Sequence, residues 1–288
     1  MKRILKLSLI ILSIVLISCG DPVIELEEVK YEPKIVVEGY LYPEEPISGI
    51  RLMRNFPLEV AIDSSSIVLT PIQNLVTAFI NDVPLEFDAL TGTYFTNQLA
   101  VDYNKAYTLK VNAKISGESL ETESTTTTPS KGFKLAQNNL GTIKYFFEKP
   151  EVKFSPSPGT GLYIFSIKPD SASLDNFIYS NPFFPNIEKK DIEENFQNFL
   201  YQMNLLLNVE STSTEITYEI SHLDTWFFSS YTVVVYAGDE NFKDYLLTVT
   251  HVQEPDGNFI EPKFHFKGNG IGIFGSAIRE TLTFNLVP

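Results

Sequence analysis

The sequence has little of the residue types that build cross-links and metal sites. Its 288 residues include one cysteine, three histidines and one tryptophan. A single cysteine excludes an internal disulfide and any multi-cysteine zinc site. Basic residues are also few, with 22 Lys and Arg against 36 Asp and Glu, which gives a formal net charge of −14. An acidic chain is repelled by a phosphate backbone, so nucleic-acid binding is not expected.

Motifs for cofactor chemistry are also missing. His222, His251 and His265 are far apart and form no HExxH pattern, so no metal and no cofactor are expected. The glycine-rich run 268–275 resembles a phosphate-binding loop, but such a loop needs a following helix, and 279–284 has the pattern of a strand. We therefore expect these glycines to allow tight turns and close backbone packing.

The N-terminus is typical of an exported lipoprotein. Lys2, Arg3 and Lys6 precede the apolar run 7–17, which is too short to span a membrane comfortably, and Ser18 precedes the single cysteine, Cys19. This arrangement matches a bacterial lipobox, in which the cysteine thiol is diacylated with palmitate-type chains, the signal is cleaved, and the new N-terminus is then acylated too. Residues 1–18 are therefore predicted to be a signal peptide and Cys19 a lipidation site. The alternative is a plain signal peptide with an incidental cysteine.

The residues after the cysteine are acidic. Residues 19–33 hold five acidic side chains and one lysine, and we interpret them as a solvated tether. Cleavage of the signal removes three positive charges, so the mature chain carries 19 − 36 = −17. The expected partner of the N-terminus is a membrane surface, contacted through the lipid anchor alone.

The rest of the sequence predicts a mainly β protein. Residues 34–130 show short β-branched and aromatic runs separated by turn residues, the pattern of an Ig-like β-sandwich. Asp102 followed by Tyr107 at a strand entrance suggests a tyrosine corner. Residues 131–288 are predicted to form a second β-rich domain with a long helix near 191–207, where apolar residues recur at helical spacing, and a short helix near 240–252 that follows a strand at 231–236.

Aromatic side chains are the candidate binding residues. They lie in a Pro-flanked segment and in a later aromatic run: Phe177, Tyr179, Phe183, Phe184 and Trp226. Exposed rings at these positions would bind a protein partner, a peptide or a glycan. The alternative is that they pack in the core.

Three segments together resemble a known family. They are the lipobox, the opening strand 33–40 and the closing runs 258–262 and 270–275. The chain resembles the Bacteroidota outer-membrane lipoproteins of domain-of-unknown-function family 4249, which also carry a Tyr-rich helix similar to residues 240–252. The resemblance implies a lipid-anchored protein on the outer membrane, facing the cell exterior and working with a TonB-dependent β-barrel receptor in nutrient uptake. It implies no catalytic residues.

We therefore expect a non-enzymatic accessory or binding lipoprotein. One alternative is a surface hydrolase that uses a carboxylate pair in the second domain. Another is an envelope assembly or structural factor that has no ligand.

Overall fold

The structure is a computed structural model that describes residues 30–288 except 58–59, 182–187, 210–213 and 250–260. Cys19, Phe183 and Phe184 lie outside the described residues, so their predicted roles are not tested by it. β-Strands are the main secondary structure of the described chain and the α-helices are few and short, which confirms the mainly β prediction. No helix in the described part is both long and apolar enough to cross a membrane.

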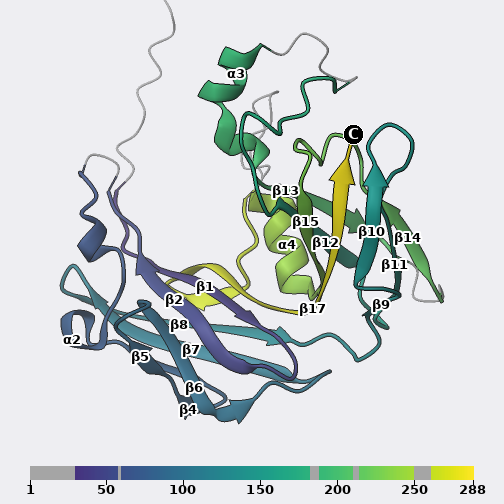
Figure 1. The fold of residues 1–288 in the computed structure, drawn as a ribbon. Coiled ribbons are helices and arrows are strands. Elements are labelled where there is room, and N and C mark those ends of the chain that lie inside the picture. The colour runs from purple at the N-terminus through teal and green to yellow at the C-terminus, as the bar shows by residue number, and fades with distance from the viewer. Residues whose placement is uncertain (1–29, 58–59, 182–187, 210–213, 250–260) are drawn as a thin grey trace, which may run out of the picture. The chain divides into compact units, whose positions relative to one another are not determined.

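Two groups of strands, all but one from the N-terminal half of the chain, face each other across a first hydrophobic core, as predicted for a β-sandwich (Figure 1). The first group is β1 (Ile35–Leu41), β2 (Pro46–Arg54), β6 (Thr93–Ala100) and β5 (Glu86–Asp88). The second is β16 (Phe266–Gly268), β8 (Glu118–Thr127), β7 (Ala106–Ile115), β3 (Thr77–Ile80) and β4 (Val83–Pro84).

Period-two patterning places the strands of this sandwich. Every second residue of β7 is buried, beginning at Tyr107, so one face of the strand lines the core. The Tyr107 hydroxyl accepts a hydrogen bond from the Asp102 N–H at 2.7 Å and donates one to the Ala100 carbonyl at 3.1 Å. The predicted tyrosine corner is therefore confirmed.

A second core lies between two further groups of strands. One contains β13 (Gln202–Leu207), β12 (Leu162–Pro169), β15 (Ser230–Gly238), β17 (Gly270–Val287) and β10 (Asn139–Lys144). The other is a three-stranded sheet of β14 (Ile216–Glu219), β11 (Glu151–Ser155) and β9 (Lys134–Leu135). Aromatic residues fill this core, with Phe154, Tyr163 and Phe165 fully or almost fully buried.

The strand β17 belongs to both cores. Its first part pairs in parallel with β1, from Ile35 opposite Gly270 to Leu41 opposite Ser276, and Phe274 packs in the first core. Its later part pairs with β15, and Leu282 packs in the second core. The sequence pattern places all of 131–288 in the second domain, but the start of β17 completes the first core.

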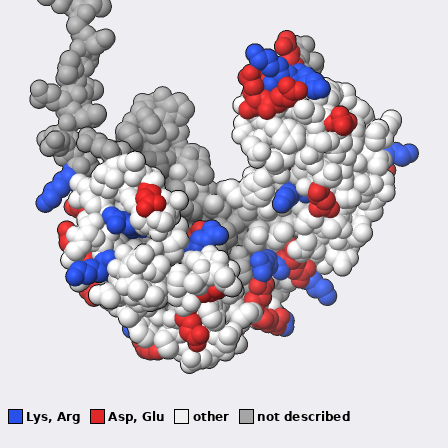
Figure 2. All heavy atoms as spheres, turned by 60° about the vertical axis from the view of Figure 1, so that its left-hand side comes forward, with Lys and Arg blue, Asp and Glu red and all other residues white. Residues whose placement is uncertain are grey.

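The long helix predicted near 191–207 is wrong. A short helix, α3 (Lys189–Glu194), is followed by a 3₁₀ turn at Phe196–Phe199 and then by β13, which pairs with β12. Charged side chains of both signs gather over α3 (Figure 2). Strand pairing prevails here because Leu206 packs in the second core while Leu205 and Leu207 pack on the opposite face, an alternation that a helix cannot provide.

The second predicted helix is present. Helix α4 (Glu240–Val249) begins where the sequence indicated, and residues beyond 249 lie outside the described part of this segment. It packs over one end of the β12–β15–β17 sheet, on the face opposite the second core, and Leu246 contacts Leu162 and Ile164 there. The only other described α-helix is a single turn, α2 (Pro71–Asn74).

Candidate functional site

Two of the predicted aromatic binding residues are buried. Phe177 is 3% exposed and Trp226 is 6% exposed, and their rings lie 5.9 Å apart in a cluster that also contains Phe199 and Phe227. The alternative of core packing therefore holds for these two rings, which pack with Ile192 of α3 and Phe199 of the 3₁₀ turn. Tyr179 is exposed, with one edge of its ring against Phe177.

A different set of side chains, three aromatic and two charged, reaches the surface. It lies on the face of the sheet opposite the second core and consists of Tyr42, Glu45, Tyr201, Tyr236 and Arg279, which we call the tyrosine–arginine surface. Tyr236 on β15 is opposite Arg279 on β17, so neighbouring strands present their side chains together. Tyr42 follows directly after β1, which pairs with the start of β17.

The guanidinium of Arg279 organises this surface. It lies 4.1 Å from the ring centre of Tyr42, and its Nε donates to Glu45 Oε1 at 2.9 Å while a second nitrogen contacts Oε2. This two-point ion pair fixes the plane of the guanidinium against the ring. The ring of Tyr236 is 6.4 Å from that of Tyr42. The result is a cluster in which the guanidinium lies over the Tyr42 ring, the Tyr236 ring is tilted beside that ring, and Glu45 holds the guanidinium.

These groups are partly removed from water but still accessible. Burial raises the pKa of Tyr42 to about 12, and burial also raises the pKa of Tyr236. The hydrogen bond to Glu45 raises the pKa of Arg279, so this side chain stays charged. Its side chain is nevertheless 42% exposed, and Tyr201 is 51% exposed. Partly desolvated Tyr and Arg side chains are typical of protein-binding hot spots.

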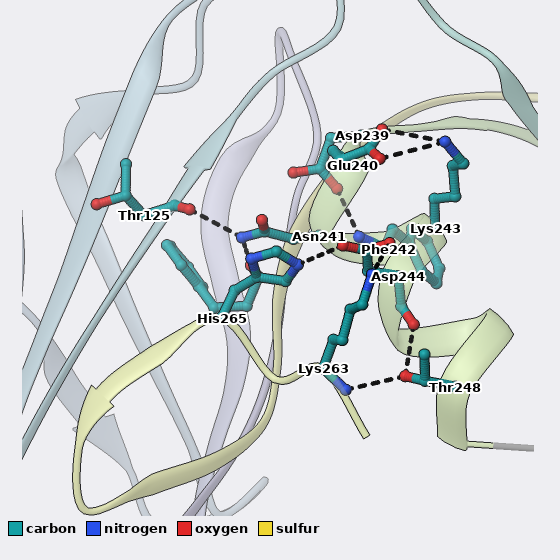
Figure 3. Close-up of polar contacts among 11 residues, drawn as sticks. Thr125, Asp239, Glu240, Asn241, Phe242, Lys243, Asp244, Thr248, Lys263 and His265 are labelled. Atoms are coloured by element: carbon teal, nitrogen blue, oxygen red, sulfur yellow. Dashed lines mark hydrogen bonds and ion pairs between the residues drawn. The ribbon is translucent and has the colours of Figure 1, made fainter. Parts of the chain in front are cut away.

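Next to this surface, the N-terminus of α4 is fixed by a polar network (Figure 3). The Asp239 carboxylate accepts from the N–H of Phe242 at 2.9 Å, which caps the helix, and from the hydroxyl of Thr126 on β8. Asn241 Nδ2 donates to the Thr125 carbonyl at 2.8 Å and to the Phe274 carbonyl at 2.9 Å. These bonds connect α4 to β8 and to β17.

A second set of contacts joins residues 263–265 to helix α4. His265 Nε2 is 2.8 Å from Asp244 Oδ2, and the Lys263 N–H donates to the hydroxyl of Thr248 at 2.9 Å (Figure 3). An Asp–His pair is one part of a hydrolytic triad, but a triad also needs a nucleophile in reach of the second ring nitrogen. No such contact is found among the described residues, so the pair is interpreted as structural.

The carboxylates offer little for hydrolysis. Asp239 is the described carboxyl whose pKa is raised, and burial is the cause. Its oxygens already accept bonds from a helix N–H and a hydroxyl, which makes it a capping group rather than an acid facing a substrate. Within the described part of the chain, no three His, Cys, Asp or Glu side chains are grouped to hold a metal. A surface hollow of about 340 Å³ lies elsewhere, over β7, β8 and β16.

Sequence reasoning missed the tyrosine–arginine surface. The alternation around Val233 and Val235, which are buried, could have placed Tyr236 on the opposite face of its strand. The position of Tyr42 beside Arg279 depends on the pairing of β1 with β17, segments from opposite ends of the chain. No local signal in the sequence predicts that pairing.

Comparisons with known proteins add little to this geometry. No protein-family model matches the chain, and no curated protein matches it. Among solved structures, a titin I-band fragment with domains I67–I69 is similar at 9% identity and a TM-score of 0.20, covering 90% of this chain and 66% of that one.

Two further similar structures are an Escherichia coli alpha-2-macroglobulin fragment and the immunoglobulin domains 1–5 of Sidekick-1. The first has 8% identity and a TM-score of 0.21 and covers 71% of this chain and 64% of that one. The second has 10% identity and a TM-score of 0.23 and covers 88% and 39%. The chain thus spans about two thirds or less of each of these three structures, and TM-scores this low carry no argument about function.

Proposed function

We propose that this protein is a non-enzymatic lipoprotein, anchored by Cys19 to the outer membrane and facing the cell exterior, that binds a TonB-dependent β-barrel receptor and supports nutrient uptake. The lipobox, the acidic residues 19–33 and the resemblance to family 4249 support the location and the partner. The surface that makes the contact is the tyrosine–arginine surface.

One observation carries the binding part of the proposal. Arg279, held by Glu45 and stacked 4.1 Å from the ring of Tyr42, is ordered before any partner arrives. Pre-ordered Tyr and Arg side chains lose little conformational freedom on binding and supply large contact areas. A half-exposed cluster of this kind, with Arg279 42% and Tyr201 51% exposed, is better suited to a macromolecular surface than to a small molecule, which is usually bound in a concave site.

The test is a pull-down of the tagged, full-length lipoprotein from detergent-solubilised outer membranes. We expect a β-barrel protein to be recovered with the wild type. Arg279→Glu places a negative charge beside Glu45 and should lower recovery of the barrel about tenfold or more, a loss typical of a hot-spot residue.

A matched control is available on the same chain. Arg51 also pairs with a glutamate on the neighbouring strand, Glu38, at 3.3 Å and with similar exposure. Arg51→Glu should therefore leave recovery unchanged while causing the same change in net charge. Recovery of the wild-type lipoprotein without any β-barrel protein would count against the proposal. Equal losses of the barrel with Arg279→Glu and Arg51→Glu would also count against it.

A further inference from the structure

The strand β13 is an edge of the largest sheet. Within the described part of the chain it pairs with β12 alone, from Gln202 opposite Ile167 to Leu207 opposite Leu162. No backbone hydrogen bond joins Gln202–Leu207 to any other described segment. Every second residue of such a strand turns its N–H and C=O away from its single neighbour, so β13 presents a row of free donors and acceptors.

This edge lacks the features that normally prevent strand pairing. Residues 195–209 contain no Asp, Glu, Lys, Arg, Pro or Gly, in clear contrast with the charged helix α3 directly before them (Figure 2). The other described sheet edges each carry a charge or a proline: Glu86 and Asp88 in β5, Pro84 in β4, Lys267 in β16, Glu219 in β14, Lys134 in β9 and Lys144 in β10. Charged residues and proline are the usual means of protecting an edge.

The side chains of β13 also favour pairing. Met203 is 40% exposed, and Leu205 and Leu207 are only partly buried against the α4 side of the sheet. A further strand beside β13 would cover these apolar groups and satisfy the free backbone groups at once. The occupant must therefore be extended, and it must bring no charge opposite these residues.

We propose that β13 pairs antiparallel with β13 of a second copy of this chain, joining the two large sheets across a two-fold axis. A second copy of β13 has the properties required of the occupant, because it is extended, uncharged and apolar. Antiparallel pairing of two identical edges is also compatible with a closed dimer. Two six-residue strands bury far less than the roughly 800 Å² per partner of a standard interface. The dimer should therefore be weak and concentration-dependent, and the net charge of −14 makes it stronger at higher salt.

Single-cysteine scanning tests the geometry directly. The mature chain with Cys19→Ala contains no cysteine, so each variant with one cysteine at a position from 201 to 207 carries a single thiol. In an antiparallel pair of identical strands, only the residues at the two-fold axis lie opposite their own copies. On mild oxidation, disulfide-linked dimer should therefore peak at one position or two adjacent positions and be low at the others.

Ile72→Cys supplies the background, because Ile72 is 90% exposed and lies outside the sheets. A second measurement is sedimentation velocity of the cysteine-free chain over a range of concentrations, where Met203→Lys should abolish the dimer and Ile72→Lys should not. Disulfide yields at all seven positions no higher than that of Ile72→Cys, or a monomer at every concentration and salt, would overturn the proposal. Recovery of the β-barrel partner is a separate readout, so either idea can fail without the other.

Discussion

At the scale of single residues, Gly272 shows why the closing run is rich in glycine. Its φ is +104°, and a Cβ at this position would lie 2.1 Å from the carbonyl oxygen of Val37 on the paired strand β1. We expect Gly272→Ala to lower the free energy of unfolding by about 3 kcal/mol or more, because the clash and the backbone strain add. Urea denaturation followed by circular dichroism measures this.

Gly141→Ala is the matched control. Gly141 also has a positive φ, +74°, but a Cβ added there would meet no atom within 4 Å. Only the backbone strain remains, so a loss of about 1 kcal/mol is expected. Equal effects of the two substitutions would show that the close approach of β1 and β17 is not what requires glycine at 272.

Residue-level reasoning from the sequence predicted the tyrosine corner, which depends on local geometry. It also predicted that the glycines allow close backbone packing, but not that β1 is the strand that approaches Gly272. It did not distinguish buried from exposed aromatic residues. Phe177 and Trp226 stand in a stretch without regular periodicity, and only the tertiary fold shows that they cover each other. Tyr42 and Arg279 show the opposite outcome. Neither lies in a motif that indicates binding, and only the fold brings them into contact.

At the scale of elements, residues 191–207 show the limit of periodicity. Apolar residues there satisfy a helical spacing, and Leu, Met and Gln are good helix formers. The run Leu205–Leu206–Leu207 fits either period, and pairing with β12 decides in favour of a strand. Helix α4 was predictable because Asp239 caps it and no strand competes for its residues.

The cap of α4 leads to a prediction about pH. Burial raises the pKa of Asp239 above its usual value of 3.8, against the lowering effect of the hydrogen bonds it accepts. The folded protein thus holds this proton more tightly than the unfolded chain does. The contribution of Asp239 to the free energy of unfolding therefore falls as the pH rises from about 4 through the raised pKa.

The substitution Asp239→Asn removes this titration while keeping an oxygen for the cap. As the pH rises from about 4 to 7, the free energy of unfolding of the variant should increase relative to that of the wild type. Urea denaturation at each pH measures this difference. Asp63→Asn is the control, because hydrogen bonds from Ser65 lower the pKa of Asp63 below 3.8, so its difference from the wild type should change below about pH 4 and stay nearly constant between pH 4 and pH 7. A difference between wild type and Asp239→Asn that does not change with pH would contradict the account.

At the scale of the whole molecule, the proposed lipid anchor at Cys19 leads to a prediction about where the protein is found. Cys19→Ala removes the thiol that the lipobox offers for acylation. We expect the variant to remain soluble or unprocessed after cell fractionation, while the wild type partitions with membranes and into detergent. Ser18→Ala, which keeps a small residue before the cysteine, should behave as the wild type. Unchanged membrane partitioning of Cys19→Ala would contradict the lipid anchor.

The mainly β class was also predictable at this scale, because alternation and turn residues repeat along the chain. The sharing of β17 between two cores was not, since it depends on a parallel pairing between strands from the two ends of the chain. That same pairing brings Tyr42 beside Arg279. The feature that sequence could not predict is therefore the one that builds the proposed binding surface.

The central claim is that this surface binds an outer-membrane β-barrel. The most direct measurement is the amount of barrel recovered per molecule of lipoprotein in parallel pull-downs of wild type and Tyr236→Ala, with equal folding checked by thermal denaturation. The account predicts a barrel with the wild type and at least about a tenfold loss with Tyr236→Ala. Equal recovery of the barrel by the two proteins would contradict it.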